Sequence, residues 1–229
     1  MAVEPRYNAV VDTVARKIVS GRIPEGAVLG LAQLQEDFGI SRTVAREVMR
    51  MLEQVGMVAP QRSVGLVVLP ASSWAVLDAR VIEWRLSGKG RQAQLRSLTE
   101  LRAGVEPVAA AAAARNASPE QRALLVDLAQ QMSVLGEQGR LKKFTEVDIA
   151  FHALLLTASG NEIFVALKDV LAVTLTGRLR HGLMPSHPKP EVLEEHNRVA
   201  RAVCAADPVT AHDAMVEMLS SIRMELFPE

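Results

Sequence analysis

The sequence contains a single cysteine, Cys204, among its 229 residues, and it has no hydrophobic run long enough to cross a membrane. One thiol excludes a disulfide framework within the chain and suits a reducing compartment. We expect this thiol to be a small buried apolar group on a helix. The N-terminus also lacks the basic and then apolar pattern of a signal peptide. These absences predict a cytoplasmic protein.

The chain also lacks net charge, because 26 lysine and arginine residues balance 26 aspartate and glutamate residues. A neutral chain argues against a protein that coats nucleic acid through bulk electrostatics, whereas a specific regulator needs only locally placed arginines. The sequence shows no nucleophile motif and no glycine loop that would cradle a phosphate, which argues against an enzyme.

The most informative pattern that is present lies between Leu31 and Gly56. Apolar residues recur at helical spacing on both sides of Gly39. Glycine tolerates the positive φ of a tight corner, Ser41 is a good N-cap for the following helix, and Gly56 is a suitable C-cap. The spacing predicts two short helices joined by a turn. Two interpretations remain open: an ordinary helical hairpin with a solvated basic face, or a helix-turn-helix that reads DNA.

Arginine residues occupy the face of the second helix that its apolar residues leave free, namely Arg42, Arg46 and Arg50. Arginine in this position can contact phosphates or bind a guanine edge in the major groove. Residues 57–69 then predict two short strands joined by a turn that carries Arg62. Such a wing favours the interpretation as a DNA-reading module, with Arg62 as a further candidate phosphate contact.

The remainder of the chain is predicted to be helical. Proline at a first helical position marks three helix starts, after Ser118, at Pro190 and at Pro208 after Asp207. The expected helices cover residues 74–86, 91–116, 119–136, 141–158, 161–182, 190–206 and 208–226. The predicted fold class is mainly α: a winged helix-turn-helix domain over residues 1–70, a linker over 71–78, and an all-helical antiparallel bundle of about six or seven helices over 79–229.

One polar group stands out within this bundle. Asp148 and His152 are four residues apart, so both project from one face of a helix whose other positions are apolar. A carboxylate and an imidazole paired in this way form half of a metal site, and His196 is a plausible third ligand from a later helix. The alternative is a hydrogen-bonded histidine in an ordinary core.

Four segments carry a resemblance to a known family. FGISRTVAREVMRMLEQVGMV resembles the DNA-binding domain of the GntR family of bacterial transcription regulators. LTELRAGVEPVAAAAAARNA, DIAFHALL and EEHNRVARAVCAADPVTAHDAM are similar to the FadR-type branch of that family, which has an all-helical effector domain called FCD. The resemblance covers nearly the whole chain with the motifs in their usual order. LDARVIEWRL further resembles regulators of sugar-acid (aldonate) catabolism, among them galactonate-responsive members.

The resemblance implies that the operator is contacted first by Arg42 and Arg46 and then by Thr43 and Arg50. This sequence departs from the family at two places. Many members carry a Glu-Arg pair whose arginine contacts DNA, whereas this chain has Leu-Ala at positions 31–32, and Ser63 stands in the wing where glycine is common. One expected DNA contact is therefore missing.

For the effector domain, the resemblance places metal ligands at Asp148, His152 and His196, with a further histidine expected at the position of Met218. His212 does not replace it, since six residues are about 600° of helix rotation and leave it roughly 120° from the face of position 218. Three ligands for zinc or a similar divalent ion remain. Open coordination positions would suit the carboxylate and adjacent hydroxyl of a 2-hydroxy acid; without metal, the same residues could hydrogen-bond sugar hydroxyls directly.

An anionic effector also needs a cation, for which a bidentate arginine is suited. The resemblance places Arg102 at a position that often faces the effector pocket, while its alternative is an ion pair with Glu106, one turn along the helix. Arg180 is a second candidate.

These observations predict a homodimeric repressor of sugar-acid catabolism that binds a pseudo-palindromic DNA operator and is released by a small carboxylate. Two alternatives are a regulator that senses another small organic acid, and a metal-dependent enzyme that uses Asp148, His152 and His196.

Overall fold

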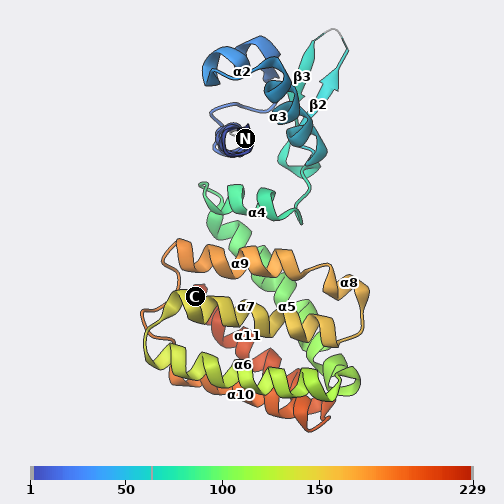
Figure 1. Cartoon of the computed structure of the whole chain (residues 1–229), viewed down its shortest axis with the longest axis vertical. Coiled ribbons are helices and arrows are strands. Elements are labelled where there is room, and N and C mark those ends of the chain that lie inside the picture. The colour runs from blue at the N-terminus through green and yellow to red at the C-terminus, as the bar shows by residue number, and fades with distance from the viewer. Residues whose placement is uncertain (1–2, 63, 228–229) are drawn as a thin grey trace. The chain divides into compact units, whose positions relative to one another are not determined.

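The computed structural model describes residues 3–62 and 64–227 (Figure 1). The chain forms two compact units, one up to Gln94 and one from Leu95. Ser63, which the sequence analysis singled out in the wing, lies outside the described residues. Within the described residues, no helix has the length and apolar character needed to cross a membrane.

The first unit combines helices with a small sheet, as predicted for a winged helix-turn-helix. Its elements are α1 (Val3–Val19), β1 (Val28–Leu29), α2 (Leu31–Phe38), α3 (Arg42–Gln54), β2 (Val58–Gln61), β3 (Gly65–Val68), a 3₁₀ turn (Ala71–Ser73) and α4 (Ala79–Leu86). Helix α3 packs on α1, α2 and β2, and together they bury a core of valine, leucine and isoleucine side chains.

The wing is a three-stranded antiparallel sheet in the order β1-β3-β2. Val58 pairs with Val68 in one ladder, and Val28 pairs with Val67 in the other. The two strands of the predicted wing are confirmed. The third strand, β1, was not predicted because its two residues are too few to show an alternating pattern.

The segment after the wing is less helical than predicted. A helix was expected over residues 74–86, but α4 begins at Ala79, where the Asp78 side chain accepts hydrogen bonds from the backbone N–H groups of Arg80 and Val81. Helix α4 packs on α1, and the indole of Trp84 donates to the Asp12 carboxylate at 2.8 Å. Residues 79–86 therefore lie with the first compact unit, whereas the sequence analysis assigned them to the effector domain; the functional boundary stays a prediction.

Gly56, just after α3, is a site where a side chain cannot be accommodated. Its φ is +70°, and a Cβ built on it would lie 2.3 Å from the backbone oxygen of Ser73. We expect Gly56→Ala to lower the free energy of unfolding by about 3 kcal/mol, from the left-handed backbone and the clash together. Gly39→Ala is the control, because Gly39 has φ +58° with open space around it and should cost only about 1–2 kcal/mol. Denaturant unfolding followed by circular dichroism measures both, and equal losses would contradict the close approach to Ser73.

The second unit is helical throughout its described residues, as predicted. It contains α5 (Arg91–Asn116, whose first turn lies before the division), α6 (Pro119–Glu137), α7 (Leu141–Ala158), α8 (Glu162–Val165), α9 (Lys168–Arg180), α10 (Pro190–Cys204) and α11 (Pro208–Leu226). The single helix expected over residues 161–182 is wrong, since α8 ends at Val165 and α9 begins at Lys168. No proline or glycine lies between them, so the sequence carries no mark of this break.

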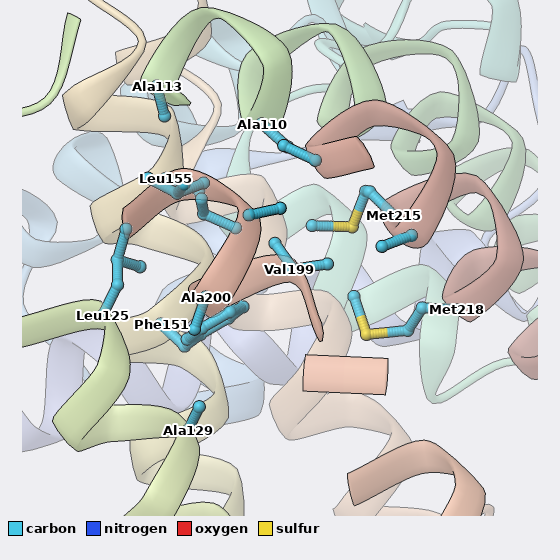
Figure 2. Packing of buried hydrophobic residues seen from close by; sticks show 14 of the residues in the cluster. Ala110, Ala113, Leu125, Ala129, Phe151, Leu155, Val199, Ala200, Met215 and Met218 are labelled. Carbon is cyan, nitrogen blue, oxygen red and sulfur yellow. The ribbon is translucent and has the colours of Figure 1, made fainter. Parts of the chain in front are cut away.

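Close packing of small residues from α5 against neighbouring helices forms the core of this unit. Helix α6 packs on α7 and α10, α7 on α9, and α10 on α11. Figure 2 shows Ala110 and Ala113 of α5 among the larger side chains of this cluster, with Met215 and Met218 of α11 on its other side. In Figure 1, α5 crosses α7 and α9 at an angle, and residues of these three helices line one cavity.

Cys204 differs from its prediction. It is the last residue of α10 and its thiol is exposed, not buried. The helix stops there because the chain turns toward α11 through Ala206, which has a positive φ of 57°.

Candidate functional site

Helix α3 has the two faces that a recognition helix requires. The Ser41 hydroxyl caps it by accepting a hydrogen bond from the Val44 N–H, and Gly39 before it adopts the left-handed conformation, so both predictions for the corner are confirmed. Its buried face consists of Ala45, Val48 and Leu52. The exposed face carries the predicted residues Arg42, Thr43, Arg46 and Arg50.

The exposed arginines of this unit differ in whether they form an ion pair. Arg50 donates to the Glu47 carboxylate at 2.7 Å in a solvent-exposed pair, whereas Arg42 and Arg46 form no ion pair within the described part of the chain. Arg62 is exposed in the turn between β2 and β3. The free guanidinium groups of Arg42 and Arg46 are therefore the ones best placed to contact DNA.

The three polar residues predicted in the bundle come together in the interior. Asp148 and His152 on α7 and His196 on α10 are all buried, with 5%, 1% and 2% of their surface exposed. Asp148 Oδ1 lies 3.2 Å from His152 Nε2 and 3.4 Å from His196 Nε2. One ligand atom from each residue falls within 4.8 Å of the others.

Neighbouring groups set the orientation of both imidazoles. His196 Nδ1 lies 2.7 Å from the backbone oxygen of Val192 and donates to it, which leaves a lone pair on Nε2. His152 Nδ1 lies 2.7 Å from Glu106 Oε2, while its Nε2 is 3.3 Å from the guanidinium of Arg102. Because arginine can only donate, a neutral His152 accepts at Nε2 and carries its hydrogen on Nδ1, which lies beside Glu106 but makes no hydrogen bond of good geometry to any described residue. Both Nε2 atoms therefore face Asp148.

Arg102 and Glu106 support this cluster from α5. Arg102 donates to both carboxylate oxygens of Glu106, at 2.6 and 3.3 Å, and both side chains are buried. The ion pair given as the alternative for Arg102 is thus present, and Arg102 also contacts His152. A buried carboxylate behind a histidine fixes the tautomer and orientation of the ring, as in the outer shell of many metal sites.

The pKa values of the cluster reflect these charges. Burial opposes ionisation of Glu106, but the charges of Arg102 and His152 outweigh it and lower the pKa of Glu106 to about 2. Burial is likewise outweighed at Asp148, whose pKa is held well below its usual range by the adjacent imidazoles of His152 and His196. Burial lowers the pKa of His152, whereas the neighbouring Glu106 carboxylate raises it. The net shift is upward. Both carboxylates are therefore ionised at neutral pH.

The donor set fits a divalent cation. Asp148 Oδ1 and His196 Nε2 are buried and have no hydrogen-bond partner among the described residues, although they face each other. Tetrahedral zinc with bonds of about 2.05 Å holds its ligands about 3.3 Å apart, close to the two separations found here. Met218 does not add to this set, because its thioether is a poor ligand for such ions and it is fully buried in the hydrophobic cluster (Figure 2). His212 is partly exposed, lies 2.9 Å from Asp213, and does not belong to the cluster.

The structure bears on one further candidate and adds two residues. Arg180 is exposed at the end of α9 and lines neither of the two cavities described below, so its contact with an effector stays a prediction that the structure does not support. Arg178, two residues earlier, is buried and lines a cavity beside Asp148 and His196. Glu106 was considered only as a partner of Arg102, not as support for His152. Helical phase could have found Arg178, because it lies one turn from Thr174 and two turns from Leu171 on the buried face of α9.

Two cavities adjoin the cluster. The first, of about 430 Å³, is lined by Asp148, His196 and Arg178 together with residues of the loop that follows α9. The second, of about 290 Å³, is lined by Arg102, Glu106 and a set of leucine and valine side chains from α5, α7 and α9.

Comparison with known proteins decides the family. The FCD domain model matches residues 97–221, and the model of bacterial regulatory proteins of the gntR family matches residues 6–68. The chain belongs to the GntR family. This GntR regulator is 30% identical over 223 residues to the galactonate operon transcriptional repressor of Escherichia coli (strain K12), covering 94% of each chain. It is 29% identical over 215 residues to the uncharacterized HTH-type transcriptional regulator YieP of the same organism, covering 93% of this chain and 91% of YieP.

Solved structures agree on the fold. E. coli McbR/YncC superposes with a TM-score of 0.55 at 20% identity, with 96% of both chains covered. Streptococcus agalactiae GntR superposes with a TM-score of 0.51 at 24% identity, covering 95% of this chain and 98% of the other. The GntR regulator described here is therefore a DNA-binding transcription regulator with an FCD effector domain, and not an enzyme. Regulators of this family bind operator DNA and small-molecule effectors.

Proposed function

We propose that this regulator is a homodimeric repressor that a small carboxylate, with sugar acids as the leading class, releases from its operator. The resemblance to the galactonate operon repressor along 94% of the chain supports the sugar-acid class. The observation that carries the proposal is the buried group of Asp148, His152 and His196, whose acceptor atoms converge with no hydrogen-bond donor between Asp148 and His196. We place the protein in the cytoplasm, where its operator is found.

On the DNA side, the proposal assigns base or phosphate contacts to five exposed residues: Arg42, Thr43, Arg46, Arg50 and Arg62. A two-fold dimer presents this set twice, so the operator is a pseudo-palindrome. Arg46 lies in the middle of the exposed face of α3 and forms no ion pair with a described residue that would have to break first. It is the residue on which sequence reading depends most.

On the effector side, Asp148, His152 and His196 would hold a divalent ion such as zinc. When bound, the ion would supply open coordination positions for a carboxylate and a neighbouring hydroxyl. Glu106 and the Val192 carbonyl orient the two imidazoles, and Arg102 holds Glu106 in place.

The charges of the site favour joint binding of ion and acid. The buried cations Arg102 and Arg178 balance the buried anions Glu106 and Asp148. A divalent ion therefore leaves two uncompensated positive charges, which an anionic effector reduces. By linkage, metal and carboxylate each increase the affinity for the other, and the effector releases DNA if it binds the non-operator conformation better.

A thermal-shift screen of small carboxylates with and without zinc tests this proposal. At 100 times its dissociation constant a ligand adds about 2.7 kcal/mol to stability, which raises Tm by about 5–10 °C for a chain of this size. We expect zinc to raise Tm, and D-galactonate or another sugar acid to raise it further only when zinc is present. Equal shifts by the acid with zinc and with a chelator would contradict the linkage, and no shift with any acid would contradict the effector class.

The second cavity favours one alternative. Apart from Arg102, Glu106 and Thr174, its lining consists of leucine and valine side chains. Such a lining suits an organic acid with an apolar substituent better than a fully hydroxylated sugar acid. Hydroxy acids with short alkyl chains therefore belong in the same screen, and their preference over sugar acids would select this alternative.

A further inference from the structure

The two buried arginines of the effector domain differ in their partners. The guanidinium of Arg102 donates to both oxygens of Glu106 and contacts His152, so its hydrogen-bonding capacity is largely used. The Arg178 side chain is equally buried, with 6% of its surface exposed. Its Nε has no partner, and its guanidinium makes no hydrogen bond or ion pair to any residue described in the structure.

A buried cation without a partner is unfavourable, because it loses hydration and gains nothing in exchange. Burial, followed by the charge of Arg102, lowers the pKa of Arg178, while Asp148 and Glu225 attract it from beyond ion-pair distance. A buried polar group left unsatisfied in a native structure calls for an explanation, and a bound ion or ligand is one such explanation. The free guanidinium therefore indicates an anion that is absent from the chain itself.

The position of Arg178 fits such an anion. Arg178 lines the cavity that Asp148 and His196 also line. The lining further contains one exposed cation, Lys189 at the N-cap of α10, and one partly buried carboxylate, Glu225 of α11. An acid in this cavity can place its carboxylate against Arg178, and a hydroxyl next to that carboxylate can donate a hydrogen bond to Asp148 Oδ1 or His196 Nε2.

We propose that Arg178 binds the carboxylate of the effector, and that Arg102 is a positioning residue that holds Glu106 and His152. The inference rests on the proposed function and makes it more specific. It predicts that ligands are recognised first as carboxylates, through a bidentate pair with a planar guanidinium, and only then by their hydroxyl or alkyl substituents.

Binding experiments with matched variants test the assignment. Arg178→Gln is compared with Arg180→Gln, which removes an exposed arginine two residues further on. Calorimetric titration of D-galactonate into the zinc-loaded protein should show about 10- to 150-fold weaker binding for Arg178→Gln, the loss expected for hydrogen bonds between charged groups. Arg180→Gln should bind like the wild type. Equal affinities for Arg178→Gln and the wild type would overturn the proposal.

Acetate serves as a probe that does not depend on the identity of the effector. At matched ionic strength, sodium acetate should raise Tm of the wild type and of Arg180→Gln relative to sodium chloride, but not Tm of Arg178→Gln. Absence of this shift in the wild type overturns the role of Arg178 while leaving operator binding, and so the proposed function, intact. Conversely, acetate stabilisation that depends on Arg178 in a protein without operator preference would support the carboxylate site and contradict the proposed function.

A stability measurement separates ligand binding from a structural role. The Arg178 guanidinium has no partner among the described residues, so its removal relieves an unfavourable burial. Arg178→Met should therefore raise Tm of the ligand-free protein by about 2–4 °C. Arg102→Met should lower Tm, because it leaves the Glu106 carboxylate buried without its cation. If Arg178→Met lowers Tm as much as Arg102→Met does, Arg178 is a structural residue and the proposal is wrong.

Discussion

Arg46→Ala is expected to abolish sequence-specific operator binding while leaving the fold intact. Each bidentate contact of arginine with guanine contributes about 1–3 kcal/mol to discrimination, and a two-fold dimer makes the contact twice. The combined loss of about 2–6 kcal/mol weakens specific binding roughly 30-fold to more than 10,000-fold. Arg46 is exposed on α3, so the free energy of unfolding should change by less than about 0.5 kcal/mol. Fluorescence anisotropy with operator DNA and denaturant unfolding measure the two quantities.

Arg80→Ala is the control for this experiment. It removes an equal charge from an exposed position in the same compact unit, but on α4 and not on α3 or the wing. We expect it to reduce operator and random-duplex binding equally and slightly. Normal footprints from Arg46→Ala, or an equally large loss of specificity from Arg80→Ala, would contradict the assignment of α3 as the reading helix.

Asp148→Asn is expected to have the largest effect on the effector domain. The carboxylate lies 3.2 and 3.4 Å from the two imidazole nitrogens and is the only charged member of the predicted ligand set. Replacing it with a neutral amide should weaken zinc binding at least about 100-fold, because changes in supporting residues alone cost about 10- to 100-fold. Zinc titration by calorimetry measures the affinity, and thermal unfolding shows whether the zinc-dependent rise in Tm is lost.

Two further variants make this result specific. Asp127→Asn changes an exposed carboxylate on α6 that accepts a hydrogen bond from Gln131, and it should bind zinc like the wild type. Glu106→Gln keeps all three ligands but removes the anion behind His152, so we expect an intermediate loss of about 10- to 100-fold. Undiminished zinc binding by Asp148→Asn would show that metal, if bound, lies elsewhere.

Local signals in the sequence predicted much of the fold. Helix α6 begins where Ser118 was expected to cap it, and α11 begins at Pro208 after the Asp207 cap, because such caps act within one turn. The spacing of Asp148 and His152 likewise places both on one face of α7. These features depend on residues close together in the chain, and so a pattern suffices to find them.

Features that depend on distant contacts were not predicted. The choice between Arg178 and Arg180 is set by which side of α9 packs on α7, and two residues differ by about 200° of rotation. The support of His152 by Glu106 requires α5 and α7 to lie side by side, which no spacing within one helix reveals. The position of α4 on α1 follows from the bond between Trp84 and Asp12, two residues far apart in sequence.

The most direct test of the account is a footprint of the purified protein on the DNA beside its own gene, at moderate ionic strength, with and without small carboxylates. The account predicts protection of a pseudo-palindrome whose half-sites lie about 10–10.5 base pairs apart, or a multiple of that spacing, since the dimer reads one face of the duplex. It also predicts that D-galactonate or a related acid removes the protection from the wild type but not from Arg178→Gln. Binding with no preference for that DNA over a random duplex would contradict the central claim.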